Sequence, residues 1–331
     1  MKKANSASSL LIAAFFAVIV LQVILSYGNN QNSSDEKGTK SAALKRPFIL
    51  NNTLVASDSS LLRGGTFWIY GWIPDKTTWA LSDKPWQAMQ DNHLNIVRVA
   101  CAYRPERAKN YSLEQYEGFL DNFIDRAEKL GIYVMIDYHP KPGTYDMTNA
   151  RAFWTRFASR YKDRENVIYE LTNEPKFSQP ENYTDQNLRD FEGLWQLTNK
   201  LAPKTPIVIM SFCQVGNTGR TPKQVTDGLQ GIDWSKTVVG FHSYWRDSSE
   251  RIVELKKYYP CINTEFHTIA QNSRNKEMQV MDGYRWHGTL MEKLGISWTQ
   301  WDVLDRQPNL QNLDSAIIDL KTKGYYWKNK N

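Results

Sequence analysis

Cysteine is scarce in this sequence. Cys101, Cys213 and Cys261 are the only three among 331 residues, and no two of them form a Cys-x-x-Cys pair. Three cysteines cannot all pair within one chain, so a fully paired disulfide framework is excluded, and we expect at least two buried free thiols. Cysteines at the spacing of a zinc site are also missing. We therefore predict no metal site, and nothing in the sequence requires a cofactor.

A glycine-rich phosphate-binding turn is missing as well. No such turn follows the first predicted strand, which disfavours nucleotide binding and, with it, a doubly wound open sheet. A large excess of charge is also missing, because the formal net charge is only +6 and the basic residues are dispersed along the chain. Nucleic acid is therefore not an expected partner.

Aromatic residues, in contrast, are abundant. The chain has 12 Trp, 17 Tyr and 13 Phe. A packed core can absorb many of them, but sugar rings present apolar faces that stack on Trp and Tyr. The aromatic content therefore favours a carbohydrate as the ligand.

Residues 1–28 have the pattern of an export signal. Lys2 and Lys3 precede an apolar run over 10–25, and Ser26-Tyr27-Gly28 supplies small residues at a cleavage site. The run is long for a cleaved signal and short for a membrane span, so cleavage and retention as an N-terminal anchor both stay open. Either way we predict a secreted or surface-anchored monomer that contacts the membrane only if the segment is retained. Residues 29–45 are polar and aperiodic, which predicts a flexible linker.

Residues 46–331 are predicted to form one catalytic domain in which strands alternate with helices. The runs rich in β-forming residues are 66–70, 95–100, 132–137, 167–172, 206–211, 237–241, 260–264 and 295–300. Apolar residues at helical spacing predict helices over 113–130, 149–162, 186–202, 248–257, 275–293 and 313–322. Eight successive strand–helix units predict an α/β fold of the closed parallel (β/α)8 barrel type.

Two of the predicted strands end in a glutamate. The run 167–175 ends in Asn173-Glu174-Pro175, where Pro175 stops the strand, and the run 259–266 places Glu265 at a similar position. The carboxyl ends of barrel strands gather at one face, and that face carries the chemistry. Two converging carboxylates are the minimum needed to cleave a glycosidic bond.

Other polar and aromatic residues follow the same predicted strand ends. Together with the two glutamates they form the ordered set Val97-Arg98-Val99, Asp137-Tyr138-His139, Asn173-Glu174-Pro175, Phe241-His242-Ser243-Tyr244, Asn263-Thr264-Glu265 and Ser297-Trp298-Thr299-Gln300-Trp301. This set resembles glycoside hydrolase family 5, the cellulase-type family of clan A barrels, over about residues 48–325. Tyr138 stands where Trp often precedes the histidine, and Asp302 follows Trp301; these two departures leave the substrate open.

The resemblance implies a retaining, two-step hydrolysis through a covalent glycosyl-enzyme. Glu174 would be the general acid/base and Glu265 the nucleophile, with their carboxyl groups about 5–5.5 Å apart. Around this pair, Arg98 and Tyr244 would keep Glu265 ionised, and Asn173 would bind the sugar 2-hydroxyl. The remaining expected sugar contacts are His139, His242, Trp301, Tyr70, Tyr103 and Trp245. Glu170, also on the fourth strand, is expected to be structural and to point elsewhere.

The implied substrate is a polysaccharide or oligosaccharide, most simply a β-1,4-glucan of the cellulose type cleaved at internal bonds. A β-mannanase is the alternative within the same family, because mannose differs from glucose only at the 2-hydroxyl. A transglycosylase would use the same intermediate with a sugar acceptor. From a different class, a carbohydrate-binding barrel without activity is the alternative, but it would have no need for both glutamates.

Overall fold

The protein was analysed as a computed structural model that describes residues 44–141, 143–175, 183–212, 220–243, 249–266 and 283–301, and residues 321 and 324. The predicted signal segment, most of the linker, most of the helix over 313–322, and the residues Cys213, Tyr244, Trp245 and Asp302 lie outside these ranges. Within the described ranges, no helix combines the length and the apolar character needed to cross a membrane.

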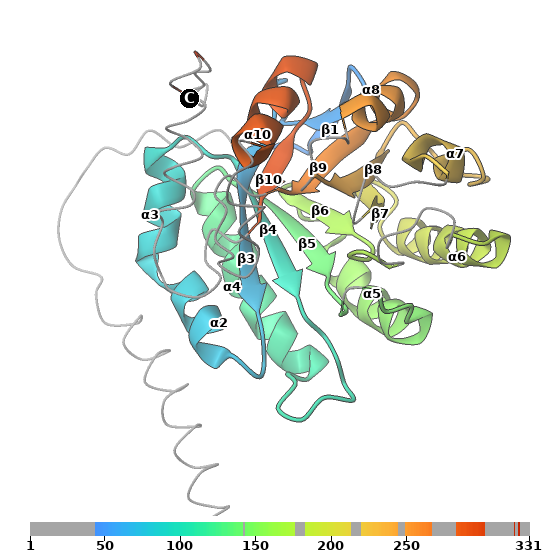
Figure 1. The fold of residues 1–331 in the computed structure, drawn as a ribbon. Coiled ribbons are helices and arrows are strands. Elements are labelled where there is room, and N and C mark those ends of the chain that lie inside the picture. Colours follow the sequence, from blue (N-terminus) through green and yellow to red (C-terminus); the bar gives the residue numbers. More distant parts are fainter. Residues whose placement is uncertain are drawn as a thin grey trace, which may run out of the picture. The chain divides into compact units, whose positions relative to one another are not determined.

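Eight parallel strands form a closed barrel, which confirms the predicted fold class (Figure 1). They are β3 (Arg63–Ile69), β4 (Ile96–Cys101), β5 (Tyr133–Tyr138), β6 (Val167–Glu170), β7 (Ile207–Phe212), β8 (Thr237–His242), β9 (Cys261–Glu265) and β10 (Trp298–Gln300). Neighbours along the chain pair from β3 to β10, and β10 pairs with β3 to close the ring. All eight strands overlap the predicted runs.

An antiparallel hairpin precedes the barrel and was not predicted. It consists of β1 (Phe48–Leu50) and β2 (Thr53–Val55), joined by Asn51 and Asn52 with φ of 48° and 53°. Positive φ at both positions is the requirement of a tight hairpin turn, and Asn tolerates it. Thr53 of β2 pairs with Cys261, the first residue of β9, so the hairpin lies at the end where the strands begin.

Leu54 of this hairpin belongs to an apolar cluster built from the first residues of the barrel strands. Its partners include Ile96, Tyr133 and Ile262, all buried. Because this cluster fills the amino-terminal end of the barrel, the carboxyl-terminal end is left for polar side chains.

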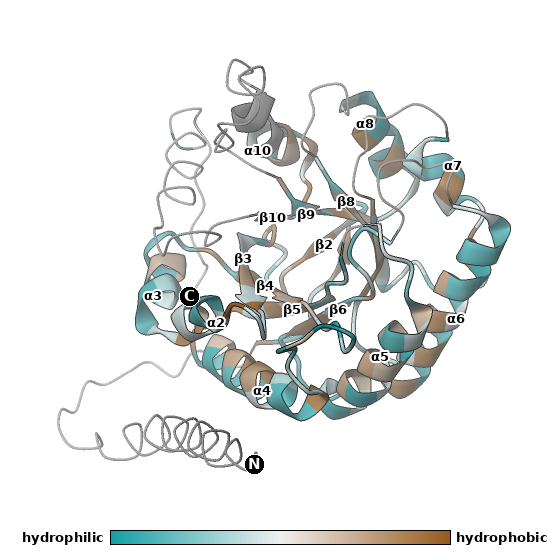
Figure 2. Cartoon of the chain, turned by 60° about the horizontal axis from the view of Figure 1, so that its bottom comes forward, coloured by the Kyte–Doolittle hydropathy of each residue, from teal (hydrophilic) through white to brown (hydrophobic). Residues whose placement is uncertain are grey.

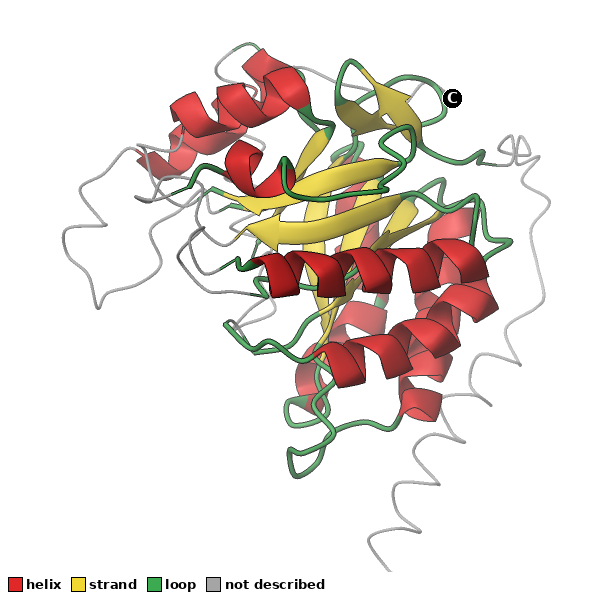
Figure 3. Cartoon of the chain, turned by 90° about the vertical axis from the view of Figure 1, so that its right-hand side faces the viewer, coloured by secondary structure: helices red, strands yellow, loops and turns green. Residues whose placement is uncertain are grey.

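Helices surround the strands (Figures 2 and 3). They are α2 (Pro74–Leu81), α3 (Asp83–Asp91), α4 (Leu113–Lys129), α5 (Met147–Tyr161), α6 (Asp185–Leu201), α7 (Pro222–Thr226), α8 (Ser249–Tyr258) and α10 (Gly283–Leu294). The predicted helices over 113–130, 149–162, 186–202 and 248–257 are confirmed within two residues, and the described part of 275–293 is helical from Gly283. Helices α2, α3 and α7 were not predicted.

Helix α4 illustrates why the predicted helices form where they do. Ser112 and Gln115 make reciprocal side-chain bonds at its N-terminus, a capping box that satisfies two backbone donors. Tyr116, Leu120 and Phe123 follow at spacings of three or four and are fully buried. The helix thus packs one apolar stripe on the barrel, which is the physical basis of the periodic signal.

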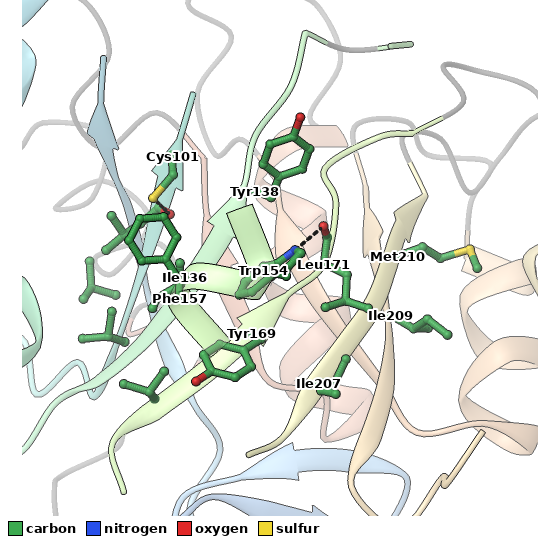
Figure 4. Packing of buried hydrophobic residues seen from close by; sticks show 14 of the residues in the cluster. Cys101, Ile136, Tyr138, Trp154, Phe157, Tyr169, Leu171, Ile207, Ile209 and Met210 are labelled. Carbon is green, nitrogen blue, oxygen red and sulfur yellow. Dashed lines mark hydrogen bonds between the residues drawn. The ribbon is translucent and has the colours of Figure 1, made fainter. Parts of the chain in front are cut away.

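The core between strands and helices is rich in aromatic side chains (Figure 4). Trp154 of α5 packs on Tyr169 of β6 with ring centroids 5.0 Å apart, and its indole Nε1 donates to the carbonyl of Leu171 at 2.8 Å. Much of the aromatic excess therefore serves packing. Cys101 and Cys261 are buried free thiols, as expected, and burial raises the pKa of both.

Candidate active site

Arg98 is the centre of the polar cluster inside the barrel. It projects from β4, is fully buried, and places its guanidinium against three carboxylates. Nη1 donates to Glu265 at 2.6 Å, Nε donates to Glu170 at 2.6 Å, and Nη2 lies 2.8 Å from Asp137. Nη2 also donates to the side-chain oxygen of Asn173 at 2.8 Å. One cation on β4 thus joins the carboxyl-terminal parts of β5, β6 and β9.

Glu174 and Glu265 converge on His242 from the ends of β6 and β9. The His242 Nδ1 atom lies 2.6 Å from Oε1 of Glu174 and 3.3 Å from Oε2 of Glu265. One donor atom from each of the three residues lies within 4.8 Å of the other two. Both glutamates are almost fully buried, with exposures of 5% and 4%. The two carboxylates can therefore face one bond of a bound molecule.

The backbone at Glu174 has an unusual conformation. Its φ is 41°, in the left-handed region that residues with a side chain rarely adopt, and the following Pro175 further restricts it. Such a conformation costs about 1–3 kcal/mol and persists only when its surroundings enforce it. The backbone of Asn173 donates to Tyr138, and Gly143 donates to the carbonyl of Glu174. Contacts on both sides thus hold the glutamate in this position.

Two acidic residues of this cluster were missed in the sequence. The prediction that Glu170 points elsewhere is wrong: it is fully buried, accepts from Arg98 and also accepts a hydrogen bond from Ser211. Asp137 bonds to both Arg98 and the His139 ring, the latter at 2.6 Å. A signal was available, because residues two apart in a strand face the same side: Asp137 follows Met135 of β5 and Glu170 follows Ile168 of β6, and both apolar residues lie inside the barrel.

Aromatic rings continue from the carboxylate cluster along the rim. Trp301 stacks parallel to His139, with centroids 5.4 Å apart, and meets Trp68 edge-on at 4.1 Å. Trp68 stacks on Tyr70 at 4.4 Å, and Tyr70 contacts Trp72 at 4.9 Å. Trp301 and Tyr70, two of the predicted sugar platforms, therefore belong to one aromatic row together with Trp68 and Trp72. Within this row Trp68 and Tyr70 are buried, with exposures of 3% and 9%, whereas Trp301 and Trp72 are partly buried.

Tyr103 lies elsewhere. Its ring meets Tyr116 edge-on at 5.9 Å and lies 6.2 Å from Phe153, both in the core between strands and helices. Tyr103 is thus not part of the aromatic row next to the carboxylates. Tyr244 and Trp245, which were also predicted, are outside the described residues.

Comparison with known proteins agrees with this geometry. A family profile described as cellulase, glycosyl hydrolase family 5, matches residues 56–307. The chain belongs to glycosyl hydrolase family 5. It is 25% identical over 205 residues to endoglucanase E-5 of Thermobifida fusca, covering 57% of this chain and 41% of that protein. It is 32% identical over 240 residues to endoglucanase MaCel5A of Microbulbifer sp. strain ALW1, covering 65% and 42%.

The family 5 chain thus spans about two fifths of the length of these curated relatives. Among solved structures, the β-glucanase SdGluc5_26A of Saccharophagus degradans aligns with a TM-score of 0.63 over 90% of this chain and 99% of that one. The identity is 16%, so this likeness concerns the fold. That β-glucanase has also been solved with cellotetraose.

Burial sets the charge of the ionisable groups in the family 5 site. It lowers the pKa of His242 to about 4, against the attraction of Glu265, and lowers the pKa of His139 well below its ordinary value. Burial raises the pKa of Asp137 to about 7, although Arg98 opposes this rise. Burial alone would lower the pKa of Arg98, but the carboxylates around it raise that pKa overall. Both histidines are therefore neutral at pH 7, and Arg98 is the cation of the site.

The same side chains offer ligands to a metal. Glu174, His242 and Glu265 are the one group of three such donors that lies close enough together within the described ranges. An ion bound there would occupy the space between the two carboxylates. It would therefore compete with any reaction that needs both of them.

We expect folding stability to fall as pH drops from about 6.5 to about 4. Over this range the unfolded chain protonates His139 and His242 while the folded chain does not, so stability is lost on acidification. Asp137, with a raised folded pKa, acts in the opposite direction between about pH 7 and 4. One net proton taken up on unfolding corresponds to about 1.4 kcal/mol per pH unit.

Asp137→Asn tests this balance. It removes the opposing group, so we expect the loss of stability per pH unit to become steeper, roughly twice the wild-type slope. Urea unfolding at several pH values measures the slope, and Asp233→Asn on the surface serves as the control. An unchanged slope in Asp137→Asn would show that Asp137 is ionised throughout this range and would contradict the prediction.

Proposed function

We propose that this protein is a retaining endo-β-1,4-glucanase that acts on glucan chains of the cellulose type. The observation that carries the proposal is the pair Glu174 and Glu265, buried at the ends of β6 and β9 with donor oxygens within 4.8 Å of each other. Retaining glycosidases need two carboxyl groups about 5–5.5 Å apart, whereas inverting enzymes leave a wider gap for water. The names of the endoglucanase relatives support the choice of substrate.

In the first step, Glu265 attacks the anomeric carbon while Glu174 gives its proton to the leaving glycosidic oxygen. The carbon–oxygen bond breaks and an ester between the sugar and Glu265 forms. Glu265 must be ionised for this attack, and the charge-assisted bond from Arg98 Nη1 at 2.6 Å favours the ionised form. Asn173 accepts from Arg98 through its oxygen, which leaves its amide nitrogen to donate to a sugar hydroxyl.

In the second step, Glu174 removes a proton from water, and the water attacks the anomeric carbon to release Glu265. Glu174 therefore alternates between a protonated and an ionised state. His242 contacts it through Nδ1 at 2.6 Å and is neutral. A neutral imidazole can accept a hydrogen bond from the acid in one tautomer and donate one to the carboxylate in the other, so it suits both states of Glu174.

Trp301 is proposed to stack on the sugar unit next to the reacting one, because its ring lies parallel to His139 and is only partly buried. Tyr70, predicted as a second platform, is buried between Trp68 and Trp72 and is proposed to support the platform from below. The export signal predicted over residues 1–28 would place the enzyme outside the cytoplasm, where polysaccharide is available. A β-mannanase or a transglycosylase would use the same two carboxylates.

The substrate is tested by release of reducing ends from a panel of polysaccharides. We expect the highest kcat/KM on mixed-linkage β-glucan and carboxymethyl cellulose. On mannan we expect values about tenfold lower, which corresponds to a cost of about 1.4 kcal/mol for one misplaced hydroxyl. If the viscosity of the polymer solution falls rapidly while few reducing ends have formed, the enzyme cleaves internal bonds. A higher kcat/KM on mannan than on both glucans would overturn the assignment, and Glu174→Gln with Glu265→Gln serves as the blank.

A further inference from the structure

The aromatic row of the site ends at the partly buried Trp72, next to two arginines. Trp72, in the loop after β3, has the guanidinium carbon of Arg107 at 4.3 Å from its ring centroid and that of Arg104 at 5.0 Å. Both arginines lie in the loop after β4, at the same end of the barrel as Glu174 and Glu265. We propose that Trp72, Arg104 and Arg107 form a subsite that binds an acidic group, a carboxylate, carried by the glycan at a distance from the cleaved bond.

The position of this basic subsite follows from the chain of ring contacts. Trp301, Trp68, Tyr70 and Trp72 are in contact in that order, at centroid distances of 4.1, 4.4 and 4.9 Å. Trp68 and Tyr70 are buried, so a glycan would stack on the partly buried Trp301 and Trp72 at the two ends of this row, and the arginines beside Trp72 lie three ring contacts away from Trp301. The inference rests on the proposed function, since it concerns the substrate of the same site.

No ion pair between described residues neutralises the charges of Arg104 and Arg107. Four other arginines on the helical layer each pair with an acidic side chain within the described ranges: Arg126, Arg156, Arg160 and Arg164. Neither Arg104 nor Arg107 has such a pair with any described carboxylate. The Nε atom of Arg104 is also buried without a hydrogen-bond partner among the described residues.

The nearby carboxylate of Glu106 does not compensate the burial of Arg104. Burial lowers the pKa of Arg104, and Arg107 lowers it further, although Tyr70 and Glu106 oppose the shift. A carboxylate of the substrate would compensate the partly buried guanidinium. The N–H donors of a guanidinium lie in its plane. An arginine whose flat face contacts the Trp72 ring can therefore still donate from its edge to a carboxylate.

The two loops that carry the subsite are fixed to each other. Gly71 approaches the second loop so closely that an added Cβ would lie 2.3 Å from the carbonyl oxygen of Lys109. Asn110 accepts from the backbone of Arg104 at 3.1 Å, and Arg107 donates to the carbonyl of Arg104 at 2.9 Å. The arginine backbones are therefore held in place before a ligand binds, which lowers the entropy cost of binding.

A matched pair of polymers tests the basic subsite. Carboxymethyl cellulose carries carboxylates and hydroxyethyl cellulose is neutral, while both have the same backbone. We expect Arg104→Gln with Arg107→Gln to raise KM for carboxymethyl cellulose about tenfold, the effect of losing roughly 1.4 kcal/mol of charge-assisted contact. The KM for hydroxyethyl cellulose should change less than about twofold, because glutamine still bonds sugar hydroxyls. Added salt should remove the difference between the two polymers in the wild type.

Lys84→Gln with Lys129→Gln removes the same formal charge from exposed helical positions and serves as the control. An equal rise in KM for both polymers would overturn the proposal in favour of neutral sugar binding, and no rise for either would exclude a subsite. Retardation of each protein in native gels that contain the polymers measures binding without catalysis. If the wild type bound carboxymethyl cellulose through these arginines but cleaved neither polymer, the proposed function would fail and the subsite would stand.

Discussion

Glu265→Ala should lower kcat on an aryl β-cellobioside by at least about 10⁴-fold, because no covalent intermediate can form without the nucleophile. The substitution also removes one partner of Arg98, but Asp137 and Glu170 remain bonded to that guanidinium. The variant should therefore fold. Circular dichroism and urea unfolding check this before the kinetics are compared.

Added azide separates the roles of the two glutamates. In Glu265→Ala the anion can enter the space left by the carboxylate and attack in a single displacement, so we expect a glycosyl azide of inverted, α configuration. In Glu174→Ala an activated leaving group still departs without an acid, and azide then displaces Glu265 from the intermediate to give the β product. Proton NMR of the anomeric centre distinguishes the two.

The opposite pattern of products would mean that Glu174 is the nucleophile and Glu265 the acid. Glu128→Ala, a carboxylate exposed on α4, is the matched control and should behave as the wild type. Products of inverted configuration from the wild type itself would exclude a retaining mechanism altogether.

The order of strands and helices was predictable because it depends on local periodicity. Each barrel strand is a run of β-forming residues, and helices such as α4 and α5 bury a stripe that recurs every three or four residues. Some short elements were not predicted in this way. The hairpin β1–β2 has three residues per strand and α7 has five residues, too few to show a period.

The site was predictable to the extent that strand ends meet in a barrel. That rule brought Arg98, Glu174 and Glu265 together, and the structure places them in contact through bonds and through His242. The rule does not say which rings at the rim face the site, so Tyr103 was chosen although it packs on the core. Glu170 was expected to point elsewhere because Glu174 was placed at the rim of the same strand, whereas Glu170 lies deeper in the barrel and bonds to Arg98.

The buried charge balance is therefore what the structure adds. Three carboxylates around a single guanidinium leave an excess of negative charge away from water, which is costly unless some of it is protonated. The raised pKa of Asp137 is one expression of this excess. Glu265 is the carboxylate that the proposed mechanism needs in ionised form, and Asp137 and Glu170 are the other two partners of the same guanidinium. Arg98 therefore affects both the stability of the folded protein and the charge of Glu265.

Arg98→Met should destabilise the folded protein by about 3–5 kcal/mol at pH 7, the effect of breaking a buried ion pair and leaving its partners uncompensated. Without the cation, the folded-state pKa values of the surrounding carboxyl groups rise, so the folded form binds more protons than the unfolded form. Stability is then lost as pH rises, and the difference from wild type should shrink on lowering the pH towards 5, where the carboxyl groups become protonated. Arg160→Met, which removes a half-exposed ion pair on α5, should cost less than about 1 kcal/mol with little dependence on pH. Urea unfolding of both variants at each pH measures these differences, and a loss for Arg98→Met that is equal at both pH values would mean that the carboxylates find other compensation.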